Sequence, residues 1–502
     1  MRAFARCCYV ALMHSQNDPT HDPSHEGQRA QSTRRVSTSQ VLAILGTIII
    51  VLLLFFAPHN SERAAELPAS WWIGTLPFAA LLGAIAVFPL LPRLAHWWHS
   101  NLNRYLVTLC ASSCALIYIG TTSGMSGVGA ALHHAIPDEY VPFMSLLFAL
   151  YVIAGGMRIE TPFCGKPREN LSILALGALC ASFVGTTGAA MILIRPLLDS
   201  IRQRKHRAHS IVFFIFIVCN CGGALLPIGD PPLFMGYLRG VPFLWTMSLW
   251  KEWLLVNGAL LALYFAIDSW FMRREQTVAV TQSGSRQFRL EGAINLPLLA
   301  LACAAVAMVV PGATVAGTTF VAPTFAREGI LMALALASWL LTARAVRQAN
   351  RFEFGAIIEV AAIFVGIFIA MQLPLQVLTA KGSSLGMESP NAFYWVTGML
   401  SSFLDNAPTY VVFFEIARTL PHVVDEAYVT LTTGMIREDL LTAISLGAVF
   451  MGANTYIGNG PNFMVKAIAE SDGVAMPSFF GYMAWSVGVL IPLLIVAEFF
   501  FP

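Results

Sequence analysis

Charged residues are scarce in this chain. Lysine and arginine number 30 and aspartate and glutamate 28 among 502 residues, so 12% of the chain is charged, against about 25% in soluble proteins. This scarcity excludes a large water-soluble domain. The net charge of +2 and the short basic segments point away from a nucleic-acid partner. Instead, 57% of the residues are hydrophobic, which makes a lipid bilayer the expected partner.

Two further patterns are missing. The nine cysteines form no zinc or redox motif, and Cys219 and Cys221 are interpreted as small buried helix residues rather than a metal pair. The first 39 residues lack the apolar stretch of a signal peptide. Their polar composition predicts a disordered cytoplasmic tail, with a start at Met13 as the open alternative. No cofactor is expected.

Long apolar runs are abundant. A membrane-spanning helix needs about 20 predominantly apolar residues. Such runs predict eleven crossings, near 40–57, 71–92, 104–122, 141–157, 210–238, 248–272, 293–311, 327–343, 356–378, 438–468 and 477–500. Two more apolar segments, 171–201 and 392–420, are interrupted at their centres by polar residues.

Basic residues give the expected orientation, because lysine and arginine prefer cytoplasmic loops. They flank 171–201 on both sides, at Arg158, Lys166, Arg168, Arg202, Arg204, Lys205 and Arg207. A simple crossing would leave one cluster outside, so we expect 171–201 to be a re-entrant hairpin that enters from the cytoplasm. The same pattern places the N-terminus in the cytoplasm and the C-terminus outside, with 392–420 entering from the outside. The loops 123–140 and 312–325 contain no lysine or arginine and are expected to be external.

Two copies of one motif interrupt predicted helices. Segments 223–235 and 452–464 share Gly, Ala, Ile, Gly, Pro, Phe and Met at matching positions, and Asp230 lies opposite Asn459. The hairpin centres 181–187 and 401–407 also match loosely. Lipid cannot satisfy exposed backbone groups, so such breaks persist where they line a cavity or an ion. Paired breaks in two halves point to the substrate site of a secondary transporter.

The predicted fold is therefore an all-α polytopic membrane protein of about 11 transmembrane helices plus two re-entrant hairpins. It contains an inverted-topology repeat with two broken helices. The predicted parts are a tail (1–39), a first transmembrane helix with an external loop (40–70), a first inverted repeat (71–272), a cytoplasmic linker (273–292) and a second inverted repeat (293–502).

The stretches 402–409 and 452–461 resemble the ion transporter superfamily, and the likeness covers roughly 71–500. That group includes sodium/proton antiporters of the NhaD type, arsenite permeases, citrate carriers of the CitMHS type and divalent-anion/sodium symporters. The resemblance implies that hairpin tips and helix breaks together hold sodium and substrate. Dicarboxylate carriers have Ser-Asn-Thr at each tip, whereas 185–188 and 405–408 read Gly-Thr-Thr-Gly and Asp-Asn-Ala-Pro. The chain is most similar to bacterial proteins regarded both as antiporters and as citrate carriers, which implies a bacterial inner membrane.

The candidate ion- and substrate-binding residues lie at these tips and breaks. Carboxylates, amides, hydroxyls and freed backbone carbonyls are the hard ligands that sodium prefers. The candidates are Asp405, Asn406, Thr409, Asn454, Thr455, Gly458, Asn459, Thr186, Thr187, Gly229 and Asp230. Among them Asp405, Asn406, Asn454 and Thr455 form the expected sodium site. Asp405 and Asp230 also precede helix starts, so a purely capping role stays open for each.

The main hypothesis is sodium/proton antiport by alternating access, because proton and sodium can compete for one carboxylate at this depth. The alternative is sodium- or proton-coupled uptake of citrate or a related organic anion. An anion site would need fixed positive charge or bare helix N-termini, and the core residues are acids and amides. An intramembrane protease is not expected, because no His-Glu-x-x-His or Gly-x-Gly-Asp motif is present. Whether the chain forms a homodimer stays open.

Overall fold

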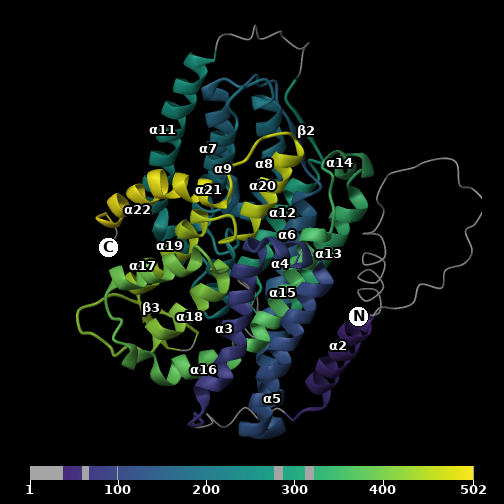
Figure 1. The fold of residues 1–502 in the computed structure, drawn as a ribbon, viewed down its shortest axis with the longest axis vertical. Coiled ribbons are helices and arrows are strands. Elements are labelled where there is room, and N and C mark those ends of the chain that lie inside the picture. The colour runs from purple at the N-terminus through teal and green to yellow at the C-terminus, as the bar shows by residue number, and fades with distance from the viewer. Residues whose placement is uncertain are drawn as a thin grey trace, which may run out of the picture.

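The computed structural model describes residues 38–58, 67–98, 100–275, 287–310, 321–432 and 434–500. The predicted tail, most of the loop before Trp71, the middle of the linker 273–292 and most of the loop 312–325 lie outside the described residues. Within the described part the chain is built from helices (Figure 1).

The bounds of the elements follow the order of the chain. The α-helices are α2 (Thr38–Phe56), α3 (Trp71–Val87), α4 (Pro92–Trp98), α5 (Asn101–His133), α6 (Val141–Ala154), α7 (Pro167–Val184), α8 (Thr186–Ile201), α9 (Ala208–Ile217), α10 (Pro231–Leu238), α11 (Trp250–Arg274), α12 (Asn295–Met308), α13 (Ala326–Leu341), α14 (Arg344–Ala349), α15 (Gly355–Ala370), α16 (Gln372–Lys381), α17 (Pro390–Ser401), α18 (Asn406–Arg418), α19 (Glu438–Met451), α20 (Gly460–Ser471), α21 (Phe479–Trp485) and α22 (Ile491–Glu498). The short helical turns are η1 (Phe88–Leu90), η2 (His134–Tyr140), η3 (Cys221–Leu225), η4 (Trp245–Leu249), η5 (Gly382–Leu385), η6 (Gly452–Asn454) and η7 (Ser486–Leu490).

Strands are few but present, although the composition predicts an all-α chain. The antiparallel pair β1 (Arg158–Glu160) and β2 (Arg289–Glu291) joins the chain before the first hairpin to the end of the predicted linker. The pair β3 (Tyr428–Thr430) and β4 (Met435–Arg437) precedes α19. Each pair is only a short ribbon, so the fold class of a helical membrane protein holds.

Candidate membrane-spanning helices are present, as the apolar runs predict. Six helical stretches of the described part are long and apolar enough to cross a membrane, and a seventh is reached if the bent pair α15–α16 forms one span. The predicted external loop 123–140 is instead helical, because α5, η2 and α6 form one continuous stretch with a kink at Gly124. The predicted spans at 293–311 and 327–343 form helices of 14 and 16 residues. Eleven crossings thus stay a prediction.

Both interrupted apolar segments form pairs of packed helices. In the first pair, α7 and α8 meet at Gly185, whose φ of 82° is unfavourable for residues with a side chain. In the second pair, α17 and α18 are joined by residues 402–405. The predicted hairpin shape is therefore present in both places. Entry of each hairpin from a particular side of the membrane stays a prediction.

Both predicted helix breaks are present and central. After α9 the chain passes through η3 and a stretch of turns and bends (226–230) before α10 begins at Pro231. After α19 it passes through η6 and a similar stretch before α20 begins at Gly460. The apolar stretch from α9 into η3 is 94% buried, whereas the other five candidate spans are 6–33% buried. The first break therefore lies at the centre of the protein rather than at its lipid-facing surface.

The two halves of the chain interlock around these breaks. The end of the first broken helix, α10, packs on the second hairpin arm α18, and α19 packs on η3. Reciprocally, α20 of the second half packs on α8 and α9 of the first (Figure 1). Residues far apart in sequence therefore meet where the two breaks and the two hairpin tips come together.

Candidate functional site

A buried carboxylate lies at the meeting point of the two halves. Asp230 is 1% exposed and ends the first helix break. Its Oδ1 accepts hydrogen bonds from the Thr186 hydroxyl at 2.8 Å and from Asn459 Nδ2 at 3.1 Å. Its Oδ2 accepts from Asn406 Nδ2 at 2.6 Å. One residue from each hairpin tip and one from the opposite break therefore converge on a single acid.

Asp230 does not act as a helix cap. Although it occupies the N-cap position of α10, its side chain makes no capping hydrogen bond. Pro231 and Pro232 follow and have no backbone N–H to offer. Both carboxylate oxygens are therefore directed to side chains of other elements. The structure does not support the alternative that Asp230 merely caps a helix.

The four residues in this cluster occupy matching positions of the two predicted repeats. Thr186 and Asn406 each begin the second arm of a hairpin. Asp230 and Asn459 are the N-caps of α10 and α20, with almost identical backbone angles (φ −141°, ψ 144° and φ −149°, ψ 141°). The carboxylate of one repeat thus binds the amide that replaces it in the other.

A second matched set of hydrogen bonds fixes each hairpin to its own helix break. Ser182 Oγ donates to Gly222 O at 2.6 Å, and Leu225 N donates to Ser182 Oγ at 3.1 Å. In the second half, Ser402 Oγ lies 3.1 Å from Met451 O and 2.8 Å from Gly398 O, to either of which it can donate, and it accepts from Asn454 Nδ2 at 2.9 Å.

Gly222 and Leu225, the partners of Ser182, lie 229 positions before Met451 and Asn454, the partners of Ser402. The same separation relates Asp230 to Asn459, so the two serines bind corresponding positions of the two breaks.

Two predicted glycines allow the chain to fold back on itself at each break. A Cβ on Gly229 would lie 2.2 Å from Gly223 O, and a Cβ on Gly458 would lie 2.6 Å from Gly452 O. These distances are too short for any side chain. Gly229 O also accepts from Thr186 N at 2.8 Å. Gly229 and Gly458 therefore shape the site through their backbone.

Four helix N-termini surround the cluster. Two helices, α8 and α18, begin at Thr186 and Asn406, which both donate to Asp230. Helix α10 begins directly after Asp230, and α20 begins directly after Asn459, the third donor. The N-terminus of a helix carries a partial positive charge. The convergence of four such ends gives the site a positive field without any basic side chain, and the buried acid partly offsets it.

Most of the other candidate residues form hydrogen bonds within the second hairpin tip and the second break, and not with Asp230. Asp405 accepts at Oδ1 from Ala407 N at 3.2 Å, which is a capping bond at the start of α18. Thr409 donates to Asp405 O at 3.0 Å. Thr455 donates to Ser402 O. Thr187 is partly exposed and makes no hydrogen bond to Asp230 in the described structure. The predicted sodium site is therefore divided, and Asn406 alone of its four members touches the central carboxylate.

Among the candidate site residues, two buried amide oxygens have no hydrogen-bond partner within the described part of the chain. They are Oδ1 of Asn406 and Oδ1 of Asn454, on side chains 0% and 8% exposed. Both amides use Nδ2 to donate, Asn406 to Asp230 and Asn454 to Ser402. Buried polar oxygens without a partner are costly. Such oxygens are suited to accept a cation.

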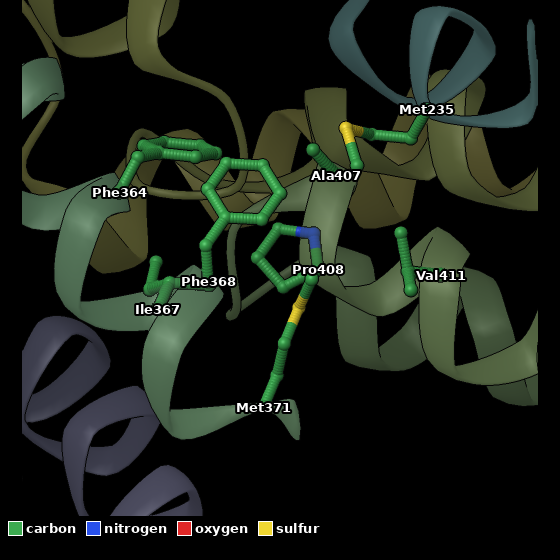
Figure 2. Close-up of a pocket in the computed structure, with 8 residues that line it drawn as sticks. All are labelled: Met235, Phe364, Ile367, Phe368, Met371, Ala407, Pro408 and Val411. Carbon is green, nitrogen blue, oxygen red and sulfur yellow. The ribbon is translucent and has the colours of Figure 1, made fainter. Parts of the chain in front are cut away.

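An apolar cleft adjoins the second hairpin tip. Figure 2 shows the rings of Phe364 and Phe368 from α15 facing Pro408, with Met371 below and Met235 from α10 opposite. Its lining contains no charged or hydrogen-bonding side chain. This cleft separates the tip of the second hairpin from α15, and it offers nothing to bind a carboxylate.

Sequence reasoning missed two asparagines. Asn220 Nδ2 donates to Asn462 Oδ1 at 2.8 Å, and Asn220 Oδ1 accepts from Asn459 Nδ2 at 3.2 Å. Asn462 Nδ2 in turn donates to the carbonyls of Gly452 and Thr455, both at 2.9 Å. Fully buried asparagines inside apolar spans were the available signal.

The model of the family described as Putative citrate transport matches residues 65–501. No curated protein matches the chain. The match spans both helix pairs, both breaks and the cluster around Asp230.

Proposed function

Because the chain belongs to the family described as Putative citrate transport, we propose that it is a secondary transporter of citrate or a related organic anion, driven by a co-transported cation. Organic-anion uptake was the alternative hypothesis from the sequence, and sodium/proton antiport was the main one. The family match lends no specific support to sodium/proton antiport. We place the N-terminus in the cytoplasm and the C-terminus outside on the distribution of basic residues. The resemblance of the sequence to bacterial transporters supports a bacterial inner membrane.

The observation that carries this proposal is the convergence of four helix N-termini on one buried cluster. Helix N-termini attract carboxylates and phosphates through the helix dipole, which acts even at α10, where Pro231 and Pro232 offer no N–H group. Judged from the sequence alone, the lack of basic side chains in the core argues against an anion. Four converging helix ends supply the positive field that such side chains would otherwise provide.

The cation would bind beside Asp230. The carboxylate, together with Oδ1 of Asn406, offers hard oxygen ligands on neighbouring side chains. Asn454 Oδ1 offers a further unpartnered oxygen at the second break. A bound cation would neutralise the buried acid, which would otherwise repel an anionic substrate. Coupling then follows, because the anion binds well only when the cation is present.

Alternating access would use the repeat. The matched bonds of Ser182 and Ser402, and the equivalent N-caps Asp230 and Asn459, support two halves of the same local construction. Inverted repeats of this kind carry a central site between two interconvertible arrangements. We propose that residues 71–272 and 293–502 are these repeats.

Sodium/proton antiport stays the second candidate. The observation that favours it is the chemistry of the Asp230 cluster, whose hydrogen-bonding side chains are a threonine and two asparagines, with no basic residue. A single carboxylate that binds either a proton or sodium is sufficient for such an exchange.

Transport by the purified chain in proteoliposomes separates the candidates. Uptake of labelled citrate should be measured under an imposed sodium gradient, an imposed proton gradient and neither. We expect uptake that requires one of the two gradients. Absence of citrate uptake, together with proton efflux on addition of sodium, would reject the anion proposal in favour of antiport.

A further inference from the structure

We propose a second anion site, which shares no residue with the Asp230 cluster and binds a phosphate-bearing anion at the predicted cytoplasmic surface. It lies between the loop that follows the first hairpin and the loop that follows α20. Its ligand chemistry is a phosphate group, supplied either by the headgroup of an anionic phospholipid or by a free phosphate compound.

The site is a cavity of about 310 Å³. Ligand pockets begin near 300 Å³, so the space is sufficient for one headgroup or small metabolite. The cavity is lined by Lys205, His206, Arg207, Ala208, His209, Phe271, Gly473, Val474, Ala475 and Trp485. Four of these residues are basic or can become so, and none is acidic.

The positive charge in the lining is not neutralised within the protein. Among the described residues neither Lys205 nor Arg207 forms an ion pair. Arg207 donates from Nη2 to the carbonyl of Gly473 at 2.6 Å, which fixes its guanidinium across the cavity between the two loops. A carbonyl leaves the charge of arginine intact, so the group stays available to an anion.

The neighbouring acids are already occupied. Arg204 binds Asp268 at 3.0 Å and Glu275 at 2.6 Å. His209 Nε2 lies 3.0 Å from the same Asp268 oxygen, and Glu275 also accepts from His206 N at 2.8 Å. Both acids are thus held by groups other than Lys205 and Arg207. Asp472 precedes Gly473 but is not part of the lining.

The backbone and the aromatic rings suit the same ligand. Helix α9 begins at Ala208 inside the lining, so the free N–H groups of its first turn lie at the cavity. The rings of His206 and His209 pack on Phe271 with centroids 4.9 and 4.7 Å apart, and Trp485 completes the apolar side. Basic pockets between helices at the cytoplasmic face are typical lipid-headgroup sites.

Binding by the full-length protein in detergent tests the site. The probes are dioctanoyl phosphatidylglycerol, net-neutral dioctanoyl phosphatidylcholine and inorganic phosphate, titrated at physiological ionic strength. We expect phosphatidylglycerol to bind, and the combined Lys205→Gln and Arg207→Gln variant to weaken its affinity at least about tenfold. The control removes two exposed basic residues outside the lining, Arg273→Gln and Arg344→Gln, and should change affinity less than about twofold.

Each result has a defined meaning. If phosphate binds and is lost in the same variant, the site takes free phosphate compounds as well. If phosphatidylglycerol alone binds, the source is lipid. The Lys205→Gln variant keeps the hydrogen bond between Arg207 and Gly473 that joins the two loops. Weakened binding in that variant would therefore come from the lost lysine charge and not from separation of the loops. No binding of either anionic probe, equal loss in the control, or equally tight phosphatidylcholine binding would overturn the proposal.

Discussion

Asn459 Nδ2 donates to Oδ1 of Asp230 at 3.1 Å and thereby joins the equivalent residues of the two helix breaks, which are 229 positions apart. An amide in one break and a carboxylate in the other make a complementary donor–acceptor pair, which two ionised carboxylates could not. The break that carries the acid therefore depends on the break that carries the amide. This asymmetry gives the site one negative charge instead of two.

The first prediction concerns Asp230→Asn. The amide group would bring a donor toward Thr186, Asn406 and Asn459, which all donate to Asp230 now, and would remove the charge. We expect cation affinity to fall about 100-fold, with loss of gradient-driven uptake in proteoliposomes. Asp138→Asn, at an acid with 53% side-chain exposure, is the control. Unchanged coupled transport by Asp230→Asn would remove Asp230 from the proposed site.

Substitutions at Asp405 can separate the effect of helix capping from the effect of its negative charge. Asparagine caps as well as aspartate, whereas alanine loses the bond to Ala407 N and costs about 1 kcal/mol. We expect Asp405→Asn to keep the thermal stability of the protein but to transport poorly, and Asp405→Ala to lose both. Thermal unfolding and proteoliposome uptake should be measured on both variants. Near-normal uptake by Asp405→Asn would leave Asp405 with a capping role only.

Close backbone packing predicts that Gly229→Ala and Gly458→Ala are harmful. Each new methyl group would lie within 2.6 Å of a carbonyl oxygen, so the break must distort at a cost of about 1–3 kcal/mol. Gly460→Ala is the matched control, because nothing lies within 4 Å of its Cβ position. Thermal unfolding in detergent should separate the two classes, and equal stability of all three variants would contradict the packing argument.

The two serines should behave alike if the halves share one construction. Ser182→Ala and Ser402→Ala each remove a donor to a buried carbonyl and an acceptor for a buried N–H group. Each should lower stability by about 1–3 kcal/mol, while Ser172→Ala, on an exposed serine, should have little effect. A loss confined to one half would argue against the equivalence.

Coupling predicts a reciprocal effect between the ligands. If sodium raises the affinity for citrate by some factor, citrate must raise the affinity for sodium by the same factor. Sodium affinity should also fall as pH falls, because a proton occupies the same carboxylate. Equilibrium binding at several pH values, with and without citrate, measures both effects. A dependence on pH with no response to citrate would favour antiport.

The sequence predicted the framework of the site but not its centre. The breaks and hairpins were recognisable because glycine, proline and polar residues interrupt apolar runs. The prediction placed sodium at Asp405, which the structure shows capping α18, whereas the convergent acid is Asp230. Pairing across halves depends on which helix ends face each other, and spacing along one half carries no information about that. The same limit hid Asn220 and Asn462, because neither has an amide at its repeat-related position.

Several segments that connect the predicted spans also differ from what their length and composition predict. The stretch 123–140 was expected to be a loop because it lies between two apolar runs, and to be external because it has no basic residue, yet it continues as helix through η2. The absence of lysine and arginine indicates a side of the membrane and does not decide between loop and helix. The short ribbons β1–β2 and β3–β4 were missed because three-residue strands leave no periodic pattern.

The position of Asp230 has a consequence for how the chain is made. Its partners Asn406 and Asn459 are synthesised at least 176 residues after it, and only Thr186 precedes it. When the first half leaves the ribosome, its buried acid therefore holds one of its three final donors. The first half must wait in the membrane with an unfinished centre until the second half arrives. A ribosome that stops between the halves would release a product whose buried acid lacks two of its three donors.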